Sequence, residues 1–165
     1  VGGWGADYVD VGIQREASAR GDLDLLAASA WPVVPVFIAD KGVLLPDVAH
    51  ACALGFPGVM ADTQDKKSGS LFDALPMHDL RRFIATARDA GTMVGLAGAL
   101  RAEHEPLLRA LAPDFAGFRT AVCEGERSSA LAPARLAQLM ALMRAQVPYR
   151  PSPSSSERTR PTSLQ

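Results

Sequence analysis

The chain has 165 residues, of which 17 are basic, 18 are acidic and 48% are hydrophobic. This length allows one domain with a sizeable core, and a net charge of -1 gives no electrostatic reason to expect nucleic acid or an anionic membrane as a partner. The two cysteines are far apart and predict neither a disulfide framework nor a zinc site. No apolar run is long enough to span a bilayer, so we expect a cytoplasmic protein.

Strand-like and helix-like segments alternate along the chain. Alternating or short β-branched apolar runs predict five strands, at Ala6–Ile13, Val33–Ala39, Gly58–Asp62, Thr92–Ala97 and Phe115–Arg119. Apolar residues at helical spacing, with glycine or proline at the ends, predict five helices, at Asp22–Ala30, Pro46–Leu54, Met77–Ala90, Glu103–Leu111 and Ala132–Ala145. Because the chain starts at Val1 rather than Met and a structured pattern begins by Ala6, we expect a part of a longer protein or a processed one.

Three of the predicted helices have an apolar stripe that we expect to face the core. The stripe of the Met77–Ala90 helix is the clearest, with residues at i, i+3, i+4 and i+7, namely Leu80, Phe83, Ile84 and Ala87. In the two later helices the expected inward residues are Leu107, Leu108 and Leu111, then Leu136, Leu139, Met140 and Met143.

The alternation of strands and helices predicts a parallel sheet with right-handed crossovers. Two α/β architectures fit this pattern. The chain is either the C-terminal five βα units of a (β/α)8 TIM barrel or a five-stranded open parallel sheet of the flavodoxin type. We place this domain at residues 1–147 and expect a disordered tail rich in proline and serine at 148–165.

Both architectures place active sites at the carboxyl ends of the strands. Asp10 lies inside the first strand, and polar residues follow the others, namely Asp40, Lys41, Asp62, Lys66, Gly98, Arg119 and Thr120. Asp62 and Lys66 could form a catalytic pair, because a carboxylate can hold a lysine in place and exchange protons with it. The alternative is a plain ion pair at the base of a loop, and we expect Lys67 to be solvated.

Gly98 follows the fourth strand, where a glycine lets backbone N–H groups approach a ligand phosphate. Arg119 would add a second donor at the next strand end. The alternative is a tight turn with a surface arginine. The three histidines fall in helices without metal-ligand spacing, so no metal site is expected, and Cys123 is expected to be a small buried filler.

Three blocks of the sequence are similar to consecutive blocks of one known family. They are "GADYVDVGI", "GVMADTQDKKSGSLFDALP" and "GTMVGLAGALRAEHEPLLRALAPDFAGFRTAVCEG", and the similarity runs from about Gly5 to Leu139. They resemble the (5-formylfuran-3-yl)methyl phosphate synthase family. The resemblance implies a TIM-barrel lyase, without a cofactor, that condenses two glyceraldehyde 3-phosphate molecules into a furan aldehyde phosphate for methanofuran-type one-carbon cofactors.

The same resemblance implies roles for individual residues. Asp62 and Lys66 match the catalytic acid and lysine of the family's D-T-x-x-K motif. Gly98, Ala99 and Leu100, with Arg119 and Thr120, match the stretches expected to hold a substrate phosphate.

The chain also departs from the family pattern. The imine-forming lysine of the family lies on an early strand that would precede Val1. A second catalytic lysine is replaced here by Asp10, and Thr120 stands where glycine is usual. The chain is therefore either part of a variant enzyme or a diverged, non-catalytic binder of phosphorylated metabolites. An open sheet edge would need covering, which favours a homo-oligomer.

Overall fold

A computed structural model of the chain describes residues 7–65, 69–123 and 130–144. Five strands form one sheet in the order β1-β2-β3-β4-β5, and every neighbouring pair is parallel. These strands are β1 (Val9–Ile13), β2 (Val33–Ile38), β3 (Gly58–Asp62), β4 (Met93–Leu96) and β5 (Phe115–Ala116). The predicted parallel sheet of consecutive strands is confirmed.

The strand order bears on the two predicted architectures. A flavodoxin-type sheet has a switch point at which the strand order reverses, whereas the strands of a barrel follow one another in sequence. The observed order is sequential throughout, as in adjoining barrel units. Among the described residues β1 and β5 are the two edges of the sheet, so the sheet is an open arc there.

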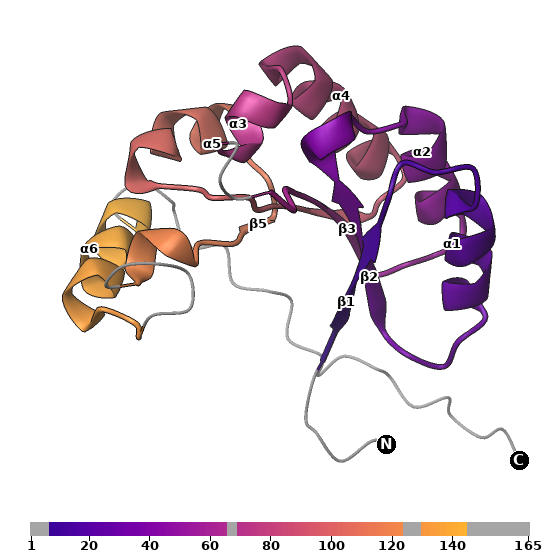
Figure 1. The fold of residues 1–165 in the computed structure, drawn as a ribbon, viewed down its shortest axis with the longest axis horizontal. Coiled ribbons are helices and arrows are strands. Elements are labelled where there is room, and N and C mark those ends of the chain that lie inside the picture. Colours follow the sequence, from indigo (N-terminus) through magenta and orange to yellow (C-terminus); the bar gives the residue numbers. More distant parts are fainter. Residues whose placement is uncertain (1–6, 66–68, 124–129, 145–165) are drawn as a thin grey trace, which may run out of the picture.

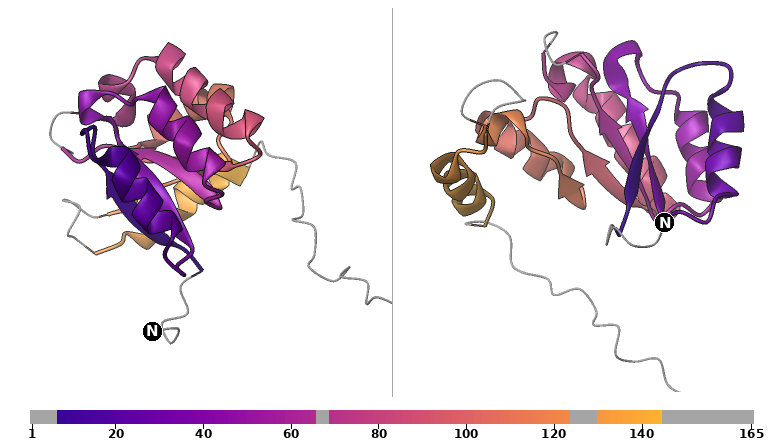
Figure 2. Two further views of the ribbon diagram at one scale, coloured as in Figure 1. Left: turned by 90° about the vertical axis from the view of Figure 1, so that its right-hand side faces the viewer. Right: turned by 60° about the horizontal axis from the view of Figure 1, so that its bottom comes forward.

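Helices cover the outer side of this arc (Figure 1). They are α1 (Ala19–Ala27), α2 (Leu45–Ala53), α3 (Leu71–Ala74), α4 (Met77–Asp89), α5 (Glu105–Leu111) and α6 (Pro133–Arg144), with 3-10 turns η1 (Ala39–Lys41), η2 (Ala102–His104) and η3 (Thr120–Val122). Helix α1 packs on α2, α2 on α4, and α4 on α5. Helix α6 lies at the far end of the arc from β1 in both figures (Figures 1 and 2).

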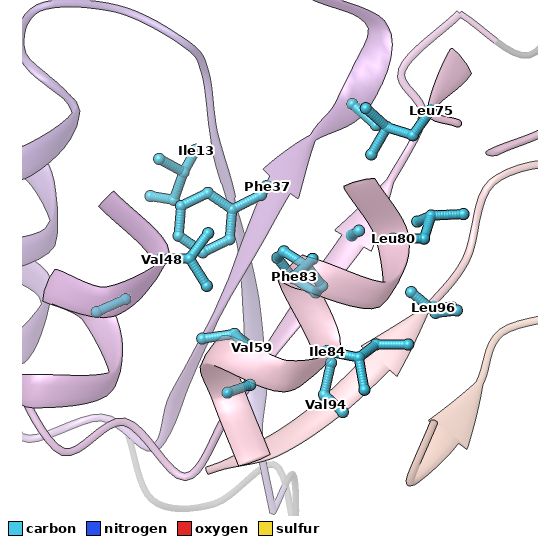
Figure 3. Packing of buried hydrophobic residues seen from close by; sticks show 14 of the residues in the cluster. Ile13, Phe37, Val48, Val59, Leu75, Leu80, Phe83, Ile84, Val94 and Leu96 are labelled. Atoms are coloured by element: carbon cyan, nitrogen blue, oxygen red, sulfur yellow. The ribbon is translucent and has the colours of Figure 1, made fainter. Parts of the chain in front are cut away.

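The main core lies between these helices and the outer face of the sheet (Figure 3). The predicted stripe of α4 is confirmed, because Leu80, Phe83, Ile84 and Ala87 are all at most 3% exposed. The ring of Phe83 meets the ring of Phe37 from β2 edge to face, with 6.0 Å between the ring centroids. This contact joins the centre of α4 directly to the centre of the sheet.

A smaller apolar cluster lies on the other, inner face of the sheet. It consists of Val34, Val36, Met60 and Ala97, with Ile38 packed against it. Side chains alternate between the two faces of a strand, so residues two apart share a face. The inner face therefore includes Asp10, which pairs with Val34, and Asp62, which follows Met60 by two residues.

Helix α1 begins at Ala19, three residues before the predicted start. Gly21 lies inside the helix, and the first turn buries Ala19 at 2% exposed. The helix ends earlier than predicted, where the hydroxyl of Ser29 donates a hydrogen bond to the carbonyl oxygen of Leu26. Burial of the first turn thus outweighs the weak helix propensity of glycine.

The predicted stripes of the two later helices are partly wrong. In α5, Leu108 and Leu111 are buried, but Leu107 is 36% exposed. In α6 Leu139 is buried, whereas Leu136 and Met140 are 38% and 40% exposed, and Met143 is half-buried. Helix α6 lies at the edge of the sheet, so part of its apolar surface has no described element against it.

Strand β5 ends at Ala116 rather than at the predicted Arg119. The N–H of Gly117 still donates to the carbonyl oxygen of Leu96 at 2.8 Å, after which the chain turns into η3. An edge strand has a neighbour on one side only, which leaves little to hold a longer strand in place. The predicted tail at 148–165 lies outside the described residues.

Candidate functional site

Asp62 is the last residue of β3 and lies half-buried on the inner face of the sheet. It pairs in register with Ile38 at the carboxyl end of β2. The N–H of Thr63 donates to Asp62 Oδ1 at 2.6 Å, and Thr63 is 2% exposed. The acid is thus held at the strand end by the next residue of its own chain.

Gly98 lies directly beside this acid, at the corresponding end of β4. A Cβ at Gly98 would lie 2.8 Å from Thr63 Oγ1 and 3.2 Å from Asp62 Oδ1. Gly98 and Ala99 have positive φ values of +113° and +46°, which only glycine adopts without strain. The structure therefore brings Asp62 and Gly98 together, as expected from the sequence.

This contact supplies a reason for the glycine that sequence reasoning missed. We expected Gly98 to make room for a ligand phosphate, but it also makes room for Thr63 and for the carboxylate of Asp62. Its carbonyl oxygen accepts the N–H of Leu71 at 2.9 Å, which joins the β4 end to the start of α3. The phosphate-binding roles of Gly98 and Ala99 stay predictions.

Helix α3 was not predicted, although the sequence carries its signal. Ser70 and Asp73 form a capping box, in which the N–H and the hydroxyl of Ser70 each donate to Asp73 Oδ2 at 2.7 Å. Hydrogen bonds from the Ser70 hydroxyl and backbone lower the pKa of the Asp73 carboxyl below its ordinary value. A serine followed three residues later by an acid, just before an apolar run, is the pattern that would have found this helix start.

Lys66, the predicted partner of Asp62, lies outside the described residues, and so does Lys67. The described part of the loop reaches Asp65. The pairing of Lys66 with Asp62 therefore stays a prediction.

Asp10 shares the inner face with Asp62 but lies deeper along the sheet. It pairs with Val34, whereas Asp62 pairs with Ile38, four residues further toward the carboxyl edge. At about 3.3 Å per residue this separates the two levels by roughly 13 Å along the strands. Asp10 is exposed, and its short side chain cannot span that distance.

Arg119 and Thr120 lie beyond β5, at the start of η3. Arg119 is exposed and Thr120 is half-buried. Thr120 lines an open groove of about 690 Å³ between η2, η3 and α6, together with Arg101 and Arg135. Glu103 lines the same groove and pairs with Arg101 at 3.1 Å, so the two arginines are partly neutralised there. The roles of Arg119 and Thr120 stay predictions.

Both cysteines are buried, as expected for Cys123. Burial raises the pKa of the Cys52 thiol, an effect that a hydrogen bond with Thr92 partly opposes. The Cys52 thiol therefore lacks the lowered pKa of a reactive cysteine. Over the described ranges there is no cluster of three or more potential metal-ligating side chains, and no helix is long and apolar enough to cross a membrane.

Comparison with known proteins agrees with the three sequence blocks. The family model for 4-HFC-P synthase matches residues 3–140. A (5-formylfuran-3-yl)methyl phosphate synthase of Archaeoglobus fulgidus is 35% identical over 150 residues, which cover 82% of this chain and 64% of the relative.

Two further relatives give the same result. A putative (5-formylfuran-3-yl)methyl phosphate synthase of Methylorubrum extorquens is 34% identical over 86% of this chain and 60% of its own length. The (5-formylfuran-3-yl)methyl phosphate synthase of Methanosarcina mazei is 32% identical over 77% of this chain and 60% of its own length. The chain thus spans less than two thirds of the length of these curated relatives. On this match it belongs to the 4-HFC-P synthase family.

Proposed function

We propose that the chain binds glyceraldehyde 3-phosphate at the carboxyl ends of β3 and β4, with Asp62 as an acid–base group. The observation that carries the proposal is the position of Asp62. It ends a central strand on the inner face and lies against the Gly98–Ala99 turn, whose two residues both have positive φ. Of these two residues Ala99 is the strained one, because it has a Cβ, and strained backbone gathers at functional sites.

The chemistry of the family's product explains the use of such an acid. Two triose phosphates become one furan aldehyde phosphate by losing one phosphate and two waters in total. Joining the two trioses forms a carbon–carbon bond and requires removal of a proton next to a carbonyl. The losses of phosphate and water require further proton transfers to the groups that leave. A half-buried carboxylate at a strand end suits the transfer of those protons.

Lys66 is the proposed partner of this acid. It follows Asp62 by four residues and matches the lysine of the family motif. In this role its ammonium group would compensate the charge of the carboxylate and would exchange protons with it.

A second candidate function is a binder of phosphorylated metabolites that does not make the furan product. Asp10 favours this candidate, because a carboxylate stands where the family has a catalytic lysine. An acid cannot form an imine, so the chemistry of that lysine is missing at this position. We therefore propose that residues 1–165 alone bind the triose phosphate but do not complete the furan.

The experiment compares the wild-type chain with Asp62→Asn, using calorimetry for binding, chromatography for the furan aldehyde, and borohydride trapping read by mass spectrometry. We expect the wild type to bind glyceraldehyde 3-phosphate without product and without a reduced adduct on Lys66. Asp62→Asn should weaken binding and leave the melting temperature within a few degrees. Product together with a Lys66 adduct would favour the complete synthase, and the absence of binding would rule out both candidates.

A further inference from the structure

Asp40 follows β2 and has no role in the proposed function so far. It lies in the η1 turn, and each of its carboxylate oxygens accepts a backbone N–H from the loop after β3. Gln64 N–H donates to Oδ2 at 2.7 Å, and Asp65 N–H donates to Oδ1 at 2.9 Å. Hydrogen bonds to an ionised acceptor are stronger than neutral ones, so this carboxylate is a firm anchor for the loop.

The anchored residues are the ones that follow Asp62. Thr63 directly precedes these two residues, and its N–H donates to Asp62 Oδ1 at 2.6 Å. Three consecutive N–H groups are therefore bound by two carboxylates, first by Asp62 and then twice by Asp40. Peptide planes are rigid, so fixing residues 64 and 65 limits how the Thr63 N–H can turn.

Thr63 is also restrained from its opposite side by the turn after β4. A Cβ at Gly98 would lie 3.0 Å from the Thr63 nitrogen, which shows how closely the two backbones approach. Thr63 thus lies between the Gly98 turn and the segment that Asp40 holds. Rotation of its N–H away from Asp62 would require one of the two neighbours to move.

Residues that directly follow β1 bind both the η1 turn that carries Asp40 and the loop after β3. Arg15 Nη1 donates to the carbonyl oxygen of Lys41 at 2.7 Å. Gln14 Nε2 donates to Gln64 Oε1, also at 2.7 Å. The loops after β1, β2 and β3 are therefore joined by hydrogen bonds that end at the backbone next to Asp62.

We propose that Asp40 is a positioning residue that sets the orientation of the Asp62 carboxylate through the backbone of residues 63–65. This inference rests on the proposed acid–base role of Asp62. It adds a residue that lies outside the D-T-x-x-K motif and acts through the backbone that follows Asp62.

The test uses Asp40→Ala, which removes both acceptors, and Asp40→Asn, which keeps one. Asp89→Ala is the matched control, because it also removes an exposed carboxylate. Asp89 is the last residue of α4 and leads into the start of β4, at the opposite edge of the sheet from Asp62. Three quantities are measured on each variant of residues 1–165. They are the amide hydrogen exchange of residues 63–65, the NMR titration of the Asp62 carboxyl carbon, and the affinity for glyceraldehyde 3-phosphate by calorimetry.

We expect Asp40→Ala to speed amide exchange at Gln64 and Asp65, to shift the Thr63 amide signal and the Asp62 titration, and to weaken triose phosphate binding roughly tenfold. Asp40→Asn should fall between Asp40→Ala and the wild type, and Asp89→Ala should match the wild type. If Asp40→Ala does not fold, the comparison of Asp40→Asn with Asp89→Ala decides the question.

Two outcomes separate the two proposals. Faster exchange at Gln64 and Asp65 with an unchanged Asp62 titration would mean that Asp40 only closes a turn, and the inference would be wrong. If the Asp62 titration moves in the variants while the wild type binds no triose phosphate, the proposed function fails and the coupling of Asp40 to Asp62 stands.

Discussion

Helix α4 at the centre of the sheet and helix α6 at its β5 end both have apolar residues at i, i+3, i+4 and i+7, but their surroundings differ. In the centre, Val59 of β3 and Leu80 of α4 are fully buried. At the far end, Leu136 and Met140 of α6 are 38% and 40% exposed, and Phe115 of β5 is 36% exposed. The two regions show that helical spacing of apolar residues leads to burial only where a second surface lies against the stripe.

The same difference appears in the candidate site. The ends of β3 and β4 are joined through Asp62, Thr63 and Gly98, whereas Arg119 and Thr120 follow a two-residue strand at the edge. We therefore expect substitutions in the centre to have large effects on both stability and binding. Substitutions at the β5–α6 end should have small effects on stability.

The largest effect is expected from Phe83→Ala in the centre. Phe83 is 1% exposed and packs against Phe37, so its truncation should lower the free energy of unfolding by about 3–5 kcal/mol. Met140→Ala, at the exposed end, should cost less than about 1 kcal/mol. Urea unfolding followed by circular dichroism measures both, and similar losses for the two variants would contradict the comparison.

A moderate effect is expected from Gly98→Ala. The new Cβ would lie 2.8 Å from Thr63 Oγ1, in a backbone with φ of +113°, so both a clash and strain should destabilise the fold by about 1–3 kcal/mol. Gly55→Ala is the matched control, because Gly55 also has a positive φ but no atom lies within 4 Å of the added Cβ.

The difference between these two glycine variants isolates the contact with Thr63 and Asp62. Gly98→Ala should lose more stability than Gly55→Ala and should also weaken binding of glyceraldehyde 3-phosphate. Equal losses in urea unfolding would show that backbone strain alone matters at Gly98. Unchanged binding in Gly98→Ala would place the phosphate elsewhere.

Much of this centre could be predicted from the sequence, because local patterns carry it. Strand β3 and the stripe of α4 depend on residues close together in the chain, and both were predicted correctly. The bonds from Asp40 to Gln64 and Asp65 join segments 24 and 25 residues apart, and no local pattern signals them. The exposure of Leu136 and Met140 depends on which elements lie against α6. The spacing of apolar residues within α6 carries no information about those neighbours.

A smaller, pH-dependent effect is expected at the start of α3. Because hydrogen bonds from Ser70 lower the pKa of Asp73 from its ordinary value of 3.8, the ionised carboxylate stabilises the fold. This stabilisation is fully present at a pH above the ordinary pKa of 3.8, which the unfolded chain has. It is lost as the pH falls through the lower pKa that Asp73 has in the folded protein. Thermal unfolding between pH 2 and pH 6 should show the loss in the wild type. Asp73→Asn should be less stable near neutral pH and should lack that part of the acid dependence.

The smallest effect, and one of opposite sign, is expected from Asp10→Thr at the β1 edge. Asp10 is exposed on a strand with a described neighbour on one side only, and aspartate is disfavoured in strands relative to threonine. The exchange should therefore stabilise the fold by about 0.5 kcal/mol.

An inward-pointing charge on an edge strand also discourages pairing with another chain, so its removal in Asp10→Thr should increase self-association. Sedimentation velocity over a concentration series measures that change, with Asp7→Thr as the control, because Asp7 carries the same charge just before β1. Equal association of the two variants would assign the effect to net charge, and unchanged association of Asp10→Thr would show that Asp10 does not protect the edge.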